Sequence, residues 1–311
     1  MISKRTGYLL VAAACTMFSC NGIVGRIAID GGVAPSEVSA IRICGAALLL
    51  LPFVVRAARR FRRAMLVPMT LYAVVGLVAA QGLFFEAVAE LDVAIVLVIV
   101  YLAPLLVAVY ERVREGEQLP LYAYLAMVVA LGGVALCVLG GIGHISTWGI
   151  VLTIVAMFVF AGQLLLASRQ PVELDPLARA GGTLLIGAIV WQLIVPVWSL
   201  PFDQLGQVVE LDGRAALSVP IGAALLWIVI LGATIPYVML LWGAIRIGAG
   251  ATSMLEMTQP VVGATIAWLV LGQQLSALQV TGIVVTVIAI GVVEQARMRL
   301  GHGQELKVVE S

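Results

Sequence analysis

A carboxylate and a proline interrupt one of the most apolar stretches of this chain. The segment TSMLEMTQP, from Thr252 to Pro260, places Glu256 between the glycine-rich runs GAIRIGAGA and VVGATIAWLVLG. A carboxylate in such surroundings must be paired, hydrated or protonated. It can hold the ammonium group of a substrate, relay a proton, or do both in turn. The segment therefore predicts a functional site.

Other polar and aromatic side chains lie within apolar runs of similar length. A charge at membrane depth costs about 2.5–3.5 kcal/mol on insertion scales, so such groups by default face the bundle interior or a wet cavity. We predict that eight residues bind substrate: Asn21, Gln81, Tyr101, Gln163, Tyr237, Trp242, Glu256 and Gln259. An alternative role for Asn21 and Gln163 is hydrogen bonding between helices. An alternative place for Trp242 is the aromatic belt at a membrane face, and Arg42 can pair with a carboxylate or extend outward.

Two prolines have a mechanical interpretation. Pro104 and Pro260 each remove a backbone donor, which frees a carbonyl one turn earlier, at Val100 and Glu256. In a membrane that carbonyl needs a side chain, a water or a ligand as its partner. We predict a kink at each proline that lets half of the helix tilt as a gate. The alternative is a static kink that serves packing.

The composition assigns the chain to the membrane. Of its 311 residues 62% are hydrophobic and 11% charged, against about 25% charged residues in soluble domains. The mean hydropathy is +1.11. A net charge of +1 gives no support for nucleic-acid binding. The four cysteines lie in apolar runs without a CxxC pair, so we expect neither a metal nor a cofactor.

A membrane-spanning helix needs about 20 mostly apolar residues, and the chain offers ten such stretches. We predict an all-α polytopic membrane protein whose transmembrane helices cover approximately residues 7–29, 35–55, 66–88, 93–112, 120–142, 148–169, 176–200, 218–242, 248–271 and 277–296. A short polar tail, 298–311, follows. The predicted partners are the lipid bilayer and a small-molecule substrate, with the chain acting as a monomer or a homodimer.

The positions of lysine and arginine predict the orientation. With the N-terminus in the cytoplasm, all but three of the 18 basic residues fall on or near the cytoplasmic side, as the positive-inside rule requires. The exceptions are Arg26, Arg42 and Arg214. The opposite orientation would translocate the segment RAARRFRR. We therefore expect both termini in the cytoplasm.

The chain contains an internal repeat. At a constant offset of 156 residues, Pro104 corresponds to Pro260, Gly116 to Gly272, Gln118 to Gln274, Leu119 to Leu275 and Gln81 to Tyr237; at an offset of 142, Phe18 and Asn21 correspond to Phe160 and Gln163. The predicted repeats are residues 1–143 and 144–297. Because five helices per repeat is an odd number, the second copy must be inverted. Inverted repeats place a substrate site near the midplane at their interface, where alternating access operates.

These features together resemble the EamA branch of the drug/metabolite transporter superfamily. The resemblance rests on ten spans in two halves and on a proline within spans four and nine that precedes a turn, Gly116-Glu117 in one half and Gly272-Gln273 in the other. The chain looks most like bacterial exporters of amino acids, including aromatic ones. The resemblance implies efflux from cytoplasm to periplasm through a central cavity, in the bacterial inner membrane.

Other functions find less support in the residues. The alternative within the superfamily is an exporter of drugs or other metabolites. An enzyme acting on lipid-linked substrates would need a catalytic motif, and the chain has no HExxH or GxSxG. A channel would show rings of one charge type or a carbonyl filter. An ATP-driven pump would carry GxxxxGK[ST] in the same chain.

Overall fold

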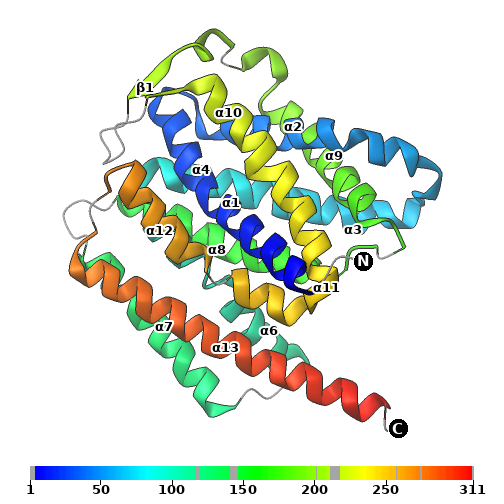
Figure 1. Ribbon diagram of the computed structural model, residues 1–311, viewed down its shortest axis with the longest axis vertical. Helices are drawn as coiled ribbons and strands as arrows, with labels where there is room; N and C mark the ends of the chain where they lie inside the picture. The colour runs from blue at the N-terminus through cyan, green and yellow to red at the C-terminus, as the bar shows by residue number, and fades with distance from the viewer. Residues whose placement is uncertain are drawn as a thin grey trace.

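The structure is a computed structural model, and it describes residues 4–115, 120–140, 146–167, 169–171, 173–200, 202–210, 218–256, 258–273 and 275–309. Five residues of the predicted turns, Gly116, Glu117, Gln118, Leu119 and Gln274, lie outside these ranges, as does Arg214. The described part of the chain is almost entirely helical (Figure 1).

Within these ranges the first half contains seven α-helices. They are α1 (Lys4–Asp30), α2 (Pro35–Arg56), α3 (Arg63–Tyr72), α4 (Ala80–Glu90), α5 (Val93–Val100), α6 (Ala103–Glu115) and α7 (Leu121–Gly140), with a 3-10 turn η1 (Ala58–Arg60) and a π-helical segment η2 (Ala73–Ala79). Segment η2 joins α3 to α4, so these three form one continuous span, Arg63–Glu90.

The second half repeats this order with one addition. Its helices are α8 (Thr147–Ala167), α9 (Pro176–Ile194), α10 (Ile221–Val229), α11 (Ile235–Glu256), α12 (Gln259–Val270) and α13 (Ala277–Val309), with the π-helical segment η5 (Ile230–Thr234) between α10 and α11. The 3-10 turns η3 (Val197–Ser199) and η4 (Phe202–Gln204) follow α9. The addition is an antiparallel pair, β1 (Val208–Glu210) and β2 (Ser218–Pro220), in which Val209 lies opposite Val219.

The predicted all-α membrane architecture is confirmed. Seven helices of the described ranges are long and apolar enough to cross a membrane, and three shorter apolar helices, Leu121–Cys137, Gln259–Val270 and Ala277–Val293, complete the ten predicted stretches. The ninth stretch is divided differently from the prediction. Gly248 has φ +85°, a left-handed conformation that glycine adopts without strain. It separates the span Ile221–Gly248 from the short helical piece that ends at Glu256.

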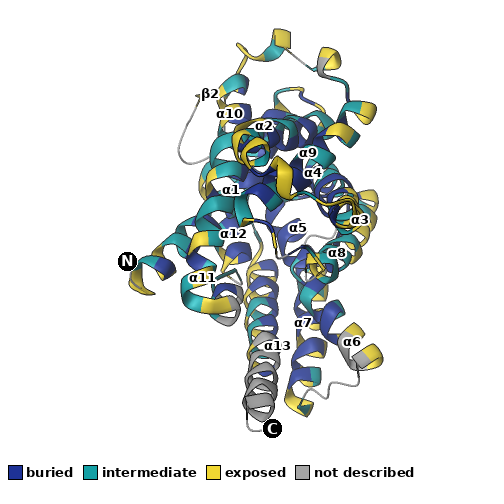
Figure 2. Ribbon diagram, turned by 90° about the vertical axis from the view of Figure 1, so that its right-hand side faces the viewer, coloured by how far each residue is buried: buried dark blue, intermediate teal, exposed yellow. Residues whose placement is uncertain are grey.

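Helix α5 occupies the centre of the molecule. All eight of its residues, VAIVLVIV, are buried, and it packs against α8 and α12. A helix that is apolar on every side is stable only where neighbours cover all of it. Figure 2 shows the buried residues gathered around α5 and the exposed ones on the outer surface.

The outer surface carries large apolar side chains. Leu193 is 82% exposed, Val113 76% and Leu121 74%. A surface of this kind is suited to lipid, because hydrocarbon solvates such side chains as well as a protein core does. Bulky apolar residues therefore occur both in the buried core and on the outer surface of the helices.

Helices α7 and α13, the fifth and tenth spans, pack along each other (Figure 1). Small residues bring the two backbones together: a Cβ on Gly133 would lie 2.8 Å from the Gly282 carbonyl oxygen and 2.9 Å from the Thr286 nitrogen. Thr286 Oγ1 also donates to the Ala130 carbonyl at 3.3 Å. Close backbone approach at small residues is how helices associate without a hydrophobic driving force.

Most of the predicted C-terminal tail, residues 298–311, is helical. Helix α13 continues without interruption from Ala277 to Val309, through most of the predicted tail. The segment QARMRL, at 295–300, consists of strong helix formers, so it extends the existing helix into the tail at little cost.

The contact between α7 and α13 can be tested with two adjacent glycines. We expect Gly133→Ala to lower the apparent melting temperature in detergent, because the added methyl group overpacks the contact at a cost of about 1–3 kcal/mol. A methyl group added at Gly132 would have nothing within 4 Å of it, so Gly132→Ala should keep or raise the melting temperature through better helix propensity. Equal melting temperatures for the two variants would contradict the packing described.

Candidate functional site

A cavity of about 380 Å³ lies between the two halves of the chain. Helices α1, α2, α3, α4, α5, α6, α8, α11 and α12 all contribute to its wall. Its lining residues are Phe18, Asn21, Arg42, Tyr72, Gln81, Phe84, Leu97, Val100, Tyr101, Ala103, Pro104, Phe160, Gln163, Leu164, Tyr237, Leu240, Glu256 and Gln259. This set is named the central cavity below.

The central cavity brings together most of the residues singled out in the sequence. Asn21, Gln81, Tyr101, Gln163, Tyr237, Glu256, Gln259 and Pro104 line it, whereas Trp242 and Pro260 do not. Trp242 is 46% exposed on the outer surface. It follows Tyr237 by five residues, which at 100° per residue turns it toward the opposite face of α11. Trp242 therefore does not line the central cavity, and the substrate-binding role of all eight residues stays a prediction.

The repeat produces two related contacts across the interface. Asn21 Nδ2 donates to the Gly232 carbonyl at 2.7 Å, and a Cβ on Gly232 would collide with Asn21 Oδ1. In the other direction, a Cβ on Gly76 would lie 2.7 Å from Gln163 Cγ. Gly76 and Gly232 correspond at the offset of 156, and Asn21 and Gln163 at 142. Each half thus places an amide side chain on the matching glycine of the other half.

Both glycines lie in π-helical segments, Gly76 in η2 and Gly232 in η5. A π-helical turn shifts the backbone hydrogen bonds to i→i+5 and is often found at functional sites. The Gly232 carbonyl accepts not only from Asn21 but also from Arg42 Nη2, at 3.3 Å. A single carbonyl of the second half therefore holds polar side chains from α1 and α2 of the first.

Arg42 is the main functional candidate absent from the predicted set. Its side chain is 4% exposed and lines the central cavity. Its Nε has no hydrogen-bond partner, and neither do the carbonyl oxygens of Asn21 and Gln163. The sequence indicated Arg42 through its position, since it is the one cation well inside the second predicted span. The sequence left open whether its side chain points inward. Tyr72 and Phe84 were also missed.

Glu256 lies on the same cavity at the last residue of α11. Its carboxylate is close enough to interact electrostatically with Tyr101 and Tyr237. Tyr237, Arg42 and Glu256 all line the central cavity. Phe18 packs edge-on against the Tyr237 ring, with 5.8 Å between ring centroids.

The two prolines begin new helices where kinks were expected. Helix α5 ends at Val100, and Pro104 is the second residue of α6; α11 ends at Glu256, and Pro260 is the second residue of α12. The first turn of a helix needs no donor at that position, so proline costs little there. The N-termini of both helices reach the cavity through Ala103, Pro104 and Gln259. Interrupted helices of this kind are tolerated at membrane depth where they line a cavity.

At one end of the cavity-lining helices, Arg26 ties α1 to α4. Its Nη1 donates to the Val88 carbonyl at 2.8 Å, and its Nε pairs with Asp30 at 2.8 Å. Burial raises the pKa of the nearby Asp92 carboxyl, and the charge of Arg26 opposes that rise. We interpret Arg26 as a structural connection, because its Nε and Nη1 donate to groups of the protein itself.

The chain matches the EamA-like transporter family twice, over residues 5–139 and 147–294. The chain belongs to that family. It is accordingly a membrane transporter of the drug/metabolite type, built from two repeats, and not an enzyme. Each matched stretch contains five of the ten helical stretches described above.

Other comparisons agree with the fold of this EamA-like transporter. A solved structure described as "Crystal structure of protein" is similar over 96% of this chain and 99% of its own length, with a TM-score of 0.63 and 16% identity. At that identity the likeness shows the fold alone. No curated protein matches this chain.

The carbonyl that joins the two halves of the transporter can be tested at Gly232. We expect Gly232→Ala to fold and insert but to lose transport about tenfold. The added methyl group would displace the side chains of Asn21 and Arg42, and a loss of about 1.4 kcal/mol in substrate binding corresponds to a tenfold effect. The measurement is uptake of radiolabelled amino acids, the substrates that the sequence predicts, into proteoliposomes with matched protein content. Gly162→Ala is the control, because its Cβ would make only an ordinary contact, 3.5 Å from Val75 Cγ1. Unchanged uptake in Gly232→Ala would contradict this role.

Proposed function

We propose that this chain exports small zwitterionic metabolites by alternating access, amino acids with apolar or aromatic side chains among them. The observation that carries the proposal is the presence of Arg42 and Glu256 on one central cavity, together with aromatic rings. An amino acid presents a carboxylate, an ammonium group and a side chain, and the cavity offers a complementary group for each.

The guanidinium of Arg42 suits the carboxylate. Arginine presents five donors in a planar fork that matches a carboxylate. In Arg42 one donor is used by the Gly232 carbonyl, and Nε has no partner. A buried donor without a partner is unfavourable, so a substrate carboxylate that satisfies Nε gains binding free energy. A cationic drug would gain nothing from this group.

Three side chains of the central cavity can accept hydrogen bonds from the ammonium group. Glu256 supplies a carboxylate, and Asn21 Oδ1 and Gln163 Oε1 are buried acceptors without a hydrogen-bond partner. The side-chain amide nitrogen of Asn21 donates to the Gly232 carbonyl. This hydrogen bond fixes which amide atom of Asn21 is the oxygen that can accept. Because Asn21 and Gln163 come from matching positions of the two repeats, both halves can contact the same head group.

The aromatic residues suit an apolar or aromatic substrate side chain. Phe18, Phe84, Tyr101, Phe160 and Tyr237 line the cavity. Its volume of about 380 Å³ lies within the usual range for small-molecule sites, about 300–1,000 Å³. Phosphorylated substrates would call for several cations, and among the described residues Arg42 is the cation that lines the cavity.

The direction and location of transport rest on the sequence. The positive-inside bias supports cytoplasmic termini, and the resemblance to bacterial amino acid exporters supports efflux across the inner membrane. The odd number of helices in each of the proposed repeats, 1–143 and 144–297, supports their inversion and a rocking motion about the central cavity. Glu256 provides a group that can couple transport to protons.

Head-group recognition can be tested by omitting parts of the substrate. In proteoliposomes we expect uptake of phenylalanine to exceed that of phenylalaninamide, which lacks the carboxylate. We expect Arg42→Gln to lower phenylalanine uptake about tenfold, a loss of about 1.4 kcal/mol, with little effect on the amide. Arg42→Lys keeps the charge and should retain part of the activity. If Arg42→Gln affected both compounds equally, the carboxylate assignment would be wrong.

Glu256 is tested by charge removal. We expect Glu256→Gln to insert normally and to lower uptake at least about tenfold, because the ammonium group loses its carboxylate. Glu86→Gln is the control, since Glu86 belongs to a span but does not line the cavity. Uptake with and without a pH gradient shows whether Glu256 also couples protons. Wild-type rates in Glu256→Gln would refute its role, and a chain that moves no amino acid would refute the substrate class.

A further inference from the structure

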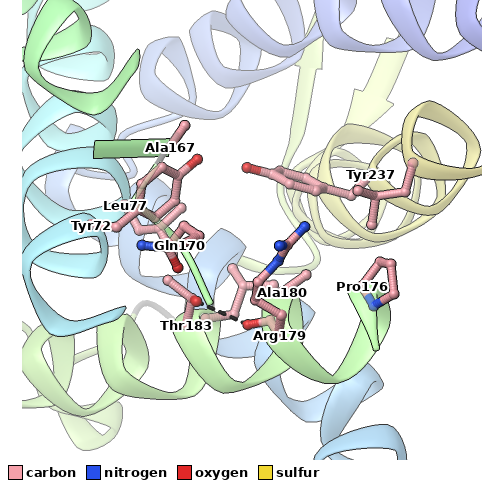
Figure 3. A pocket seen from close by; sticks show the side chains of 11 residues that line it. Tyr72, Leu77, Ala167, Gln170, Pro176, Arg179, Ala180, Thr183 and Tyr237 are labelled. Atoms are coloured by element: carbon pink, nitrogen blue, oxygen red, sulfur yellow. Dashed lines mark hydrogen bonds between the residues drawn. The ribbon is translucent and has the colours of Figure 1, made fainter. Parts of the chain in front are cut away.

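A second pocket, of about 220 Å³, adjoins the central cavity. It is lined by Tyr72, Leu77, Ala167, Gln170, Pro176, Arg179, Ala180, Thr183, Leu184, Tyr237 and Leu241. Most of these residues come from the end of α8, the start of α9 and the connection between them (Figure 3). In the predicted orientation this connection lies on the cytoplasmic side.

Tyr72 and Tyr237 belong to the walls of both the second pocket and the central cavity. Their hydroxyl groups point toward each other (Figure 3), and Tyr237 interacts with Tyr72 through its side chain. Tyr72 also accepts a hydrogen bond from Gln163 Nε2 at 3.2 Å. The two phenols therefore form the boundary between the two spaces.

The boundary joins the two halves of the transporter. Tyr72 ends α3 of the first half, whereas Tyr237 lies in α11 and Gln163 in α8 of the second. A rocking motion of one half against the other must separate these side chains. The hydrogen bond from Gln163 to Tyr72 is made across the surface that alternating access has to open.

The second pocket has a mostly apolar lining with a few polar groups. The Arg179 guanidinium points into it (Figure 3). One of its nitrogens, Nη1, donates to the Pro171 carbonyl at 3.3 Å, and within the described ranges no carboxylate forms an ion pair with it. The neighbouring Asp175 accepts from the backbone nitrogens of Leu177 and Ala178. Gln170 Oε1 is buried in the pocket wall without a hydrogen-bond partner.

From this arrangement we propose that the second pocket is an antechamber for carboxylate-bearing substrates and that Tyr72 and Tyr237 are the closed gate between it and the central cavity. Arg179 receives the carboxylate in the antechamber. Opening of the gate then passes the substrate to Arg42, which lines the central cavity beyond Tyr237. The inference of a gate depends only on the positions of Tyr72 and Tyr237, whereas the carboxylate specificity rests on the proposed function.

The gate is tested by thiol labelling in membrane vesicles of both orientations. Thr183→Cys reports on the antechamber and Ala103→Cys on the central cavity. The reagent is a charged, membrane-impermeant methanethiosulfonate, and the chain without an introduced cysteine is the blank. The antechamber side is the side from which Thr183→Cys reacts faster. From that side we expect Ala103→Cys to react about tenfold more slowly than Thr183→Cys.

Removal of the two phenols should open the path. With Tyr72→Ala and Tyr237→Ala combined, we expect labelling of Ala103→Cys from the antechamber side to rise about tenfold, with Thr183→Cys unchanged. Tyr101→Ala is the control, since Tyr101 lines the central cavity but not the second pocket. The Tyr variants without an introduced cysteine show whether native thiols have become reactive. If Ala103→Cys reacts as fast as Thr183→Cys in the presence of both tyrosines, or is unaffected by their removal, there is no gate here.

The antechamber is tested separately at Arg179. We expect Arg179→Gln to raise the KM for phenylalanine about tenfold with an unchanged KM for phenylalaninamide, and Arg179→Lys to restore part of the difference. Equal changes for the two compounds would overturn the carboxylate assignment. If the chain transports no amino acid, that assignment falls together with the proposed function, while the labelling result still decides the gate.

Discussion

Hydrocarbon offers a polar group no hydrogen-bond partner, and the architecture of this transporter follows from that constraint. Irregular backbone survives at membrane depth only where protein or a wet cavity satisfies it. Here the interruptions at Tyr101–Leu102 and Thr258, and the π-helical segments η2 and η5, all lie next to the central cavity. The Gly232 carbonyl shows how the constraint is met, since it accepts from Asn21 and Arg42 of the other half.

The two halves share a scaffold and differ in chemistry. The matching glycines, prolines and amides hold corresponding places in both repeats. The charged groups do not, because Glu256 corresponds to Val100 at the offset of 156. In the proposed function, the symmetric scaffold provides two related half-sites for motion, and the asymmetric pair of charges provides a direction along which a zwitterion can bind.

The proposed gate gives the second pocket a role in transport. The phenols of Tyr72 and Tyr237 lie between two spaces, each of which contains an arginine. In the proposed path, an anionic group stays near a guanidinium on both sides of the gate. Hydrogen bonds between hydroxyl and amide side chains are weak enough to be exchanged during a conformational change, with a net worth of about 0.5–1.5 kcal/mol each.

The amino-acid sequence by itself determined the class of protein, the ten helical stretches, the repeat and most of the polar side chains of the cavity. These features follow from hydropathy and spacing, which are local properties of the chain. Hydropathy could not place Arg42 or Trp242, because it does not tell which face of a helix turns inward. It also could not distinguish a kinked helix from two helices at Pro104 and Pro260. Only the tertiary structure decided these points, since they depend on packing between helices: Gly232 offers Arg42 an inward partner, and the face of α11 that carries Tyr237 into the cavity leaves Trp242 facing outward.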